Sequence, residues 1–425
     1  VAGFLLGTVS GSGVATTVTL GSVAWPVLRR AGYSAETGGA MLSAAGIGAL
    51  LSPPTLGAAA FLIAEFLQIS YLQVLVMATV PTLLYYLSIF LMVEADSSKA
   101  AAVRQAGGPG EDQGARPGAS GIDPLPSAGA MALRYWYHFT SLLAIAVFMV
   151  AGMSAFRAVF WATLVAVALS YVRRETALTA PRLFDALRAG GQDVLAVAAT
   201  TATAGIIVGI VTLTGLGLEI AGVIVALAGG TLVLTAIYSA IAVWLLGLAV
   251  PVTASYIIAA VMVAPALVTA GVSAIAAHMF IFYYAVLSEV SPPTALSPFA
   301  AAALTGGNPF RTMVQTWKYT LPAFLVPFVF TTGPDGAGVL LQGALKTSLV
   351  ATVSAIGGIA AIAIAGGGWM KGRVHPAARI ALASSAAVLL WGSLHWRLAA
   401  ATSAVVVLIL HFTGRSPRGE PVGGG

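Results

Sequence analysis

The chain contains no cysteine, and only 8% of its 425 residues are charged. The lack of thiols excludes disulfides, thiolate metal sites and cysteine nucleophiles. Because a soluble domain of average composition carries about 25% charged residues, the low charge argues against an ordinary soluble fold. No His-Glu-x-x-His zinc motif, Gly-x-Ser-x-Gly nucleophile motif or Walker A phosphate loop occurs. These absences argue against an intramembrane enzyme and against an ATP-driven pump.

Apolar residues make up 59% of the chain, and the mean hydropathy is +0.95. Many apolar runs reach the length of about 20 residues that a membrane helix needs, and they are too long and uniform for β-barrel strands. The sequence therefore predicts an all-α polytopic membrane protein. The net charge of +6 fits cytoplasmic loops rich in Lys and Arg, and no nucleic-acid partner is expected. The chain starts inside an apolar run without a signal peptide, so we expect a protein truncated at its N-terminus.

The tetrapeptide Ser-Pro-Pro-Thr occurs twice inside apolar runs, at residues 52–55 and at residues 291–294, an offset of 239 positions (291 − 52). At the same offset Pro26 falls on Pro265 without a gap. A duplicated stretch of roughly 75 residues, each copy with a proline-broken membrane segment, is typical of secondary transporters built from repeats. The pairing favours a transporter over an ion channel or passive pore.

Each repeated tetrapeptide predicts a break in a membrane helix. Two prolines remove two backbone donors and so release carbonyls of the preceding turn. Released carbonyls and nearby hydroxyls can coordinate a hard cation, although a plain proline kink is the alternative for either copy. The Gly/Ser stretch at 10–13 aligns with the stretch at 249–253. Each stretch is interpreted as the tip of a re-entrant hairpin, with a continuous, closely packed helix as the alternative.

These features predict five regions. They are a first inverted repeat (1–93), a cytoplasmic loop (94–134), scaffold helices with an amphipathic interfacial helix (135–192), a second inverted repeat (193–332) and a C-terminal extension with three membrane helices (333–425). The interfacial helix is expected at 179–188 and a separate span at 194–214. With the first hairpin opening to the cytoplasm, every Lys and Arg except Arg157, Lys346 and Arg397 lies inside. The positive-inside rule selects this orientation, in which the two copies are inverted.

Several separated motifs agree in order and spacing with one family. They are SGSGVA at 10–15, RAGY at 30–33, PPTLGAAAF at 53–61, PPTAL at 292–296 and LPAFLVPF at 321–328. Over roughly residues 1–330 the chain resembles the large permease subunit of TRAP transporters (tripartite ATP-independent periplasmic transporters). It is most similar to the fused permeases of the TAXI subfamily.

The resemblance implies a mechanism as well as a fold. Both hairpins and both broken helices would form an elevator-type transport domain that moves against a scaffold. The permease, which is no enzyme, would import organic anions (carboxylates) delivered by a periplasmic TAXI/TRAP-type substrate-binding protein. A sodium gradient, or a proton gradient as the alternative, would drive transport without any other cofactor. A small membrane subunit, or fused N-terminal helices, would complete the system in a bacterial or archaeal inner membrane.

The resemblance also implies site residues. The first cation site would comprise Ser10, Ser12, Ser52 and Thr55, and the second Thr253, Ser255, Ser291 and Thr294. The substrate would lie between tips and breaks, against Gly11, Gly13, Pro53, Pro54, Pro251, Pro292 and Pro293. Each hydroxyl could instead bond its own helix. Glu289 is a candidate coupling carboxylate for sodium or protons, because a carboxylate inside a membrane segment is functional by default. The alternative is a carboxylate that faces a water-filled cavity without a coupling role.

Overall fold

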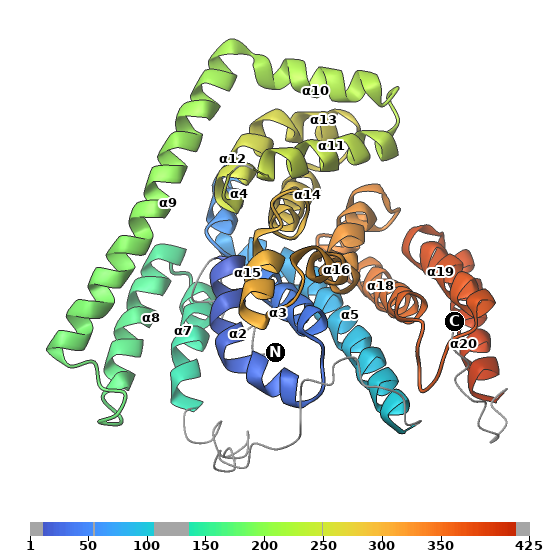
Figure 1. Ribbon diagram of the computed structural model, residues 1–425. Coiled ribbons are helices and arrows are strands. Elements are labelled where there is room, and N and C mark those ends of the chain that lie inside the picture. Colours follow the sequence, from blue (N-terminus) through green and yellow to red (C-terminus); the bar gives the residue numbers. More distant parts are fainter. Residues whose placement is uncertain (1–11, 54–55, 106–135, 249, 414–425) are drawn as a thin grey trace.

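A computed structural model describes residues 12–53, 56–105, 136–248 and 250–413. Apart from one isolated bridge between Trp369 and Arg373, the regular elements of this described part are helices (Figure 1). Four of the helices are long and apolar enough to cross a membrane: Tyr71–Ala102, Ala180–Thr214, Leu345–Gly367 and Leu394–Thr413. Shorter apolar helices accompany them. The predicted all-α polytopic fold is confirmed.

The first copy of the repeat folds into four helices. They are α2 (Gly13–Arg30), α3 (Ala35–Leu50), α4 (Ala59–Leu67) and α5 (Tyr71–Gln105). The Ser12 side chain caps α2 by accepting from the Ala15 amide, and Ser34 caps α3 by accepting from Thr37. Such caps satisfy donors that a helix start leaves open. Between α3 and α4 the helix is broken where the prolines predict it.

The second copy contains helices that correspond to these. Its helices are α10 (Leu216–Leu227), α11 (Leu232–Gly247), α12 (Val252–Met262), α13 (Ala264–Thr269), α14 (Ala274–Leu287), η2 (Ser288–Val290), α15 (Leu296–Thr305) and α16 (Pro309–Thr332). The chain turns between α11 and α12, which pack against each other as the predicted hairpin. The returning arm is divided at Val263, so Pro265, which cannot donate a helical hydrogen bond, lies in the first turn of α13, whereas the equivalent Pro26 lies inside the undivided α2. Helix α10 was not predicted.

The predicted start of the cytoplasmic loop at residue 94 is wrong. Helix α5 continues past that position to Gln105. Lys318 Nζ lies 2.6 Å from Asp96 Oδ1, and the Tyr319 hydroxyl donates to Asp96 Oδ2 at 2.5 Å. These contacts from α16 give the charged end of α5 partners, so it need not leave the helix.

The predicted boundary between residues 192 and 193 is also wrong. The expected interfacial helix and the expected span that follows it form one 35-residue helix, α9 (Ala180–Thr214). Glycine costs a helix only about 1 kcal/mol relative to alanine, and Gly190 and Gly191 do not interrupt it. Before α9 lie η1 (Trp136–His138), α7 (Phe139–Val150) and α8 (Ala155–Ser170), within the region where scaffold helices are predicted (135–192).

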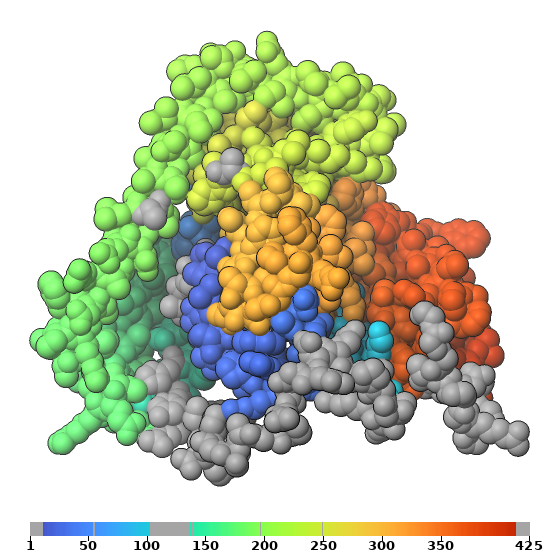
Figure 2. All heavy atoms as spheres, in the orientation of Figure 1, coloured from blue at the N-terminus to red at the C-terminus, as the bar shows by residue number. Residues whose placement is uncertain are grey.

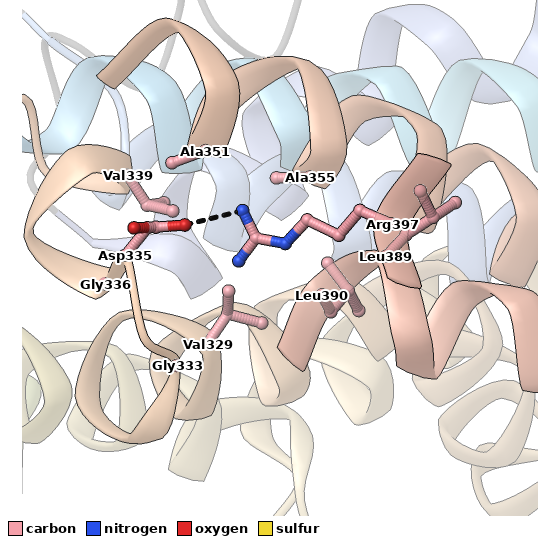
Figure 3. A pocket seen from close by; sticks show the side chains of 10 residues that line it. All are labelled: Val329, Gly333, Asp335, Gly336, Val339, Ala351, Ala355, Leu389, Leu390 and Arg397. Atoms are coloured by element: carbon pink, nitrogen blue, oxygen red, sulfur yellow. Dashed lines mark hydrogen bonds and ion pairs between the residues drawn. The ribbon is translucent and has the colours of Figure 1, made fainter. Parts of the chain in front are cut away.

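The C-terminal part contains the three expected helices, α18 (Leu345–Gly367), α19 (Pro376–Trp391) and α20 (Leu394–Thr413), after the short α17 (Gly336–Val339). Figure 3 shows how Arg397 of α20 reaches past Leu390 toward Asp335, and its Nη1 lies 2.7 Å from Asp335 Oδ2. The cavity beside this ion pair holds about 10 Å³, room for about one water molecule. Ligand pockets are far larger, so this cavity is no substrate site. The ion pair beside it joins α20 to the segment that follows α16.

Helix α14 lies at the centre of the molecule, and every residue from Ala276 to Leu287 is buried (Figure 1). It packs against α11, α12, α16 and α4, so both repeats surround it. In the space-filling view the orange α15 lies on the blue helices of the first repeat (Figure 2), in agreement with its packing on α2 and α3. The C-terminal end of α14, where the second break begins, is therefore enclosed by both copies.

Candidate functional site

The two breaks have the same local geometry. Ser52 Oγ donates to the Gly48 carbonyl at 2.5 Å, and Ser291 Oγ donates to the Leu287 carbonyl at 2.8 Å. In each copy the serine carbonyl then accepts from the residue four positions later, Leu56 or Ala295. Both of those residues have left-handed backbones, with φ of 42° and 38°. The duplication read from the sequence is therefore also a structural equivalence.

In each break one backbone carbonyl has no helical donor. The Glu289 carbonyl would accept from the N–H three or four positions later, but those residues are Pro292 and Pro293, neither of which has an N–H. Leu50 holds the equivalent position in the first copy (289 − 239). The neighbouring carbonyls are partnered, since Trp317 Nε1 donates to Val290 at 3.0 Å. The Leu50 and Glu289 carbonyls therefore lack helical donors at matched positions in the two copies.

Helix α2 of the first repeat meets the second break at Glu289. A Cβ built on Gly13 would lie 2.3 Å from Glu289 Oε2, so the carboxylate packs directly on the first turn of α2. The Oε2 atom is buried and has no hydrogen-bond partner within the described part of the chain. A helix start favours a negative charge because its N–H groups point outward. Glu289 of the second repeat therefore contacts the first repeat. Spacing along the sequence does not reveal this contact.

The second hairpin packs its tip on the same break. Ser255 Oγ donates to the Val250 carbonyl at 3.3 Å, and its side chain is fully buried. A Cβ on Gly247 would lie 2.3 Å from Ser288 Oγ and 3.5 Å from Ser255 Oγ. Gly247 thus allows the hairpin to approach the end of α14. Ser288 was missed by the sequence reasoning, and its position three residues before Ser291 was the available signal.

A chain of buried hydroxyls also joins the repeats. Ser297 Oγ of α15 lies 2.8 Å from Thr17 Oγ1 of α2 and 2.9 Å from Ser43 Oγ of α3. Thr17 in turn donates to the Gly13 carbonyl at 2.7 Å. These hydrogen-bonded hydroxyls fix the position of the start of α2 relative to the second repeat, and so they also fix its contact with Glu289. None of these three hydroxyls was singled out from the sequence.

The remaining predicted site residues are placed only in part. Ser10, Gly11, Pro54 and Thr55 lie outside the described residues. Thr253, Thr294, Pro53 and Pro292 are half-buried, whereas Pro251 and Pro293 are exposed. The described members of the second set come from two adjoining elements, the second hairpin and the second break. Of the first set, Ser12 lies at the start of α2 and Ser52 in the first break.

One family model matches most of the chain. It is described as "Tripartite ATP-independent periplasmic transporter, DctM component" and covers residues 1–334. The chain belongs to the DctM family. A comparison with curated proteins finds no match.

The DctM match confirms the resemblance to the TRAP permease subunit. It includes both breaks and the second hairpin and ends directly after α16, so helices α18 to α20 lie beyond it. Together with the apolar helices, membership of the DctM family identifies a multi-pass integral membrane protein and the permease component of a tripartite transporter.

Proposed function

We propose that this DctM-family permease imports organic carboxylates across a bacterial or archaeal inner membrane, driven by a sodium gradient. A periplasmic substrate-binding protein of the TAXI type delivers the substrate, and a small membrane subunit or fused N-terminal helices complete the transporter. The observation that carries the proposal is the matched pair of breaks at Ser52 and Ser291, each with the same hydroxyl contact and the same left-handed residue.

The donors at the breaks suit sodium. Hard cations prefer oxygen ligands, and the breaks offer serine hydroxyls and backbone carbonyls. Ser52 and Ser12, with Ser10 and Thr55, make the first proposed cation site. Ser291 and Ser255, with Thr253 and Thr294, make the second. The substrate carboxylate binds between the tips and the breaks, where the starts of α2 and α12 favour an anion.

Loss of either serine hydroxyl should weaken sodium binding. We expect Ser52→Ala and Ser291→Ala each to raise the sodium concentration for half-maximal uptake about tenfold, the effect of losing one ligand worth about 1.4 kcal/mol. The measurement is uptake by proteoliposomes that contain the complete transporter and its binding protein. Thr402→Ala is the matched control, because Thr402 makes the same bond to a carbonyl four residues earlier on the exposed face of α20. Unchanged sodium dependence in both variants would remove the two proposed sites.

Glu289 is proposed to assist cation coupling. Its carboxylate lies between the start of α2 and the second break, so its negative charge stabilises a cation bound near either element. We expect Glu289→Gln to lower sodium-driven uptake by at least about tenfold at limiting sodium. Glu65→Gln, on the exposed face of α4, is the control and should be without effect. If Glu289→Gln changed only uptake driven by a pH gradient, the carboxylate would carry protons instead.

Imposing the two gradients separately tests the whole proposal. A sodium gradient should drive accumulation of the carboxylate with no ATP present. Uptake that is indifferent to both the sodium and the proton gradient, and that only equilibrates the carboxylate, would rule out secondary transport and favour a passive pore.

A further inference from the structure

An apolar groove lies between α11, α14 and α16, apart from the proposed cation sites. Its volume is about 350 Å³. Trp244 of α11, Tyr284 of α14 and Trp317 of α16 line it together with aliphatic and phenylalanine side chains. The two indole rings meet edge to face, with centroids 6.3 Å apart. The groove is therefore large enough for a ligand and is walled mainly by rings.

Two of the three polar atoms on these aromatic walls are bonded elsewhere, and the third, Trp244 Nε1, is buried without a hydrogen-bond partner among the described residues. Tyr284 donates its hydroxyl to the Phe324 carbonyl at 2.9 Å, and Trp317 donates its indole N–H to the Val290 carbonyl at 3.0 Å. The groove surface therefore consists mainly of ring faces and methyl groups, with one indole N–H left unbonded. Ordered water needs two to four polar partners, and a single donor does not supply them. A hydrocarbon therefore suits the groove better than water.

The groove opens onto an exposed apolar surface of α11. Ile237 and Ile241, which line it on α11, are 37% and 42% exposed. The lining residues of α11 and α16 come from the interiors of these helices and not from their ends. In a multi-pass membrane protein the material that surrounds such a surface is the acyl chains of the bilayer. We propose that the groove is a binding site for one acyl chain of a bilayer lipid.

The bound chain also contacts a residue that holds the second break. Trp317 forms one wall of the groove, and its N–H fixes the Val290 carbonyl next to Ser291. An acyl chain packed on the indole ring makes dispersion contacts that an empty groove would lack. These contacts restrain the position of the ring. The groove thus links the lipid to the geometry of the break. Binding itself does not depend on the proposed transport function.

Photo-crosslinking tests the site on the full chain in vesicles. The probe is phosphatidylethanolamine with a diazirine in the middle of one acyl chain, mixed into unlabelled phosphatidylethanolamine and phosphatidylglycerol. Adducts mapped by mass spectrometry should be about tenfold more frequent at the groove than around Ile206 and Leu213, which are 65% and 89% exposed on α9. These α9 positions report ordinary contact with the bilayer.

Two variants that fill the groove from opposite walls provide the decisive comparison. Ala240→Leu on α11 and Leu321→Trp on α16 should each reduce groove adducts about tenfold and leave the α9 adducts unchanged. Retained tryptophan unfolding transitions identify which variants are folded. Groove labelling no higher than that of α9, unchanged labelling in the folded variants, or crosslinks from the groove to another polypeptide would overturn the proposal.

Discussion

Replacing Asp335 by alanine should lower the free energy of unfolding by about 3–5 kcal/mol, the usual cost of leaving a buried charge without its partner. The charge in question belongs to Arg397, which is only 4% exposed. Its Nη1 lies 2.7 Å from Asp335 Oδ2, and its Nε has no partner within the described residues. Asp335 is therefore the carboxylate that balances a guanidinium held between α20 and the end of α16.

The double variant separates this cost from a simple loss of attraction. Because removing both charges leaves no buried ion, Asp335→Ala combined with Arg397→Leu should be more stable than Asp335→Ala alone. Tryptophan fluorescence during denaturant unfolding of the detergent-solubilised protein measures the difference. Lys346→Ala, at an exposed position at the start of α18, is the control for general loss of charge. Equal stability of the single and double variants would contradict the explanation.

Replacing Gly46 by alanine should displace helix α2. A Cβ at this position would lie 2.0 Å from Thr17 Oγ1 and 2.6 Å from the Gly13 carbonyl oxygen. The carbonyl belongs to the backbone, so α2 must move away from α3. Overpacking of this kind costs about 1–3 kcal/mol in stability. The uptake rate should fall even under conditions in which the variant remains folded, because the shift moves Gly13 away from Glu289.

Gly205→Ala is the matched control for this prediction. Gly205 lies within α9, and the space that a methyl group would occupy there is open, so alanine should leave stability unchanged or raise it slightly. Thr17→Ala in the Gly46→Ala background should restore only part of the loss, since the Gly13 carbonyl still obstructs the new methyl group. Normal uptake and stability for Gly46→Ala would show that α2 and α3 are not held at this spacing.

The features that the sequence predicted best are those with local causes. Both breaks follow from prolines that cannot donate, and Ser52 and Ser291 show that the same local sequence produces the same turn twice. The three C-terminal helices follow from their apolar length. Helix–helix contacts at distant positions could not be read in this way. The end of α5 depends on Lys318, and the environment of Glu289 depends on Gly13, more than 200 positions away in each case (318 − 96 = 222; 289 − 13 = 276).

The unbroken helix α9 has a mechanical consequence. Its 35 residues extend about 52 Å, well beyond a hydrocarbon layer of about 30 Å. No proline lies between residues 182 and 214 to act as a joint, and only 12% of its most apolar window is buried. A rotation of roughly 10° about one end therefore swings the other by about 9 Å. Because α9 packs against α12 and α10, a change in the tilt of α9 would displace the second hairpin through its contact with α12.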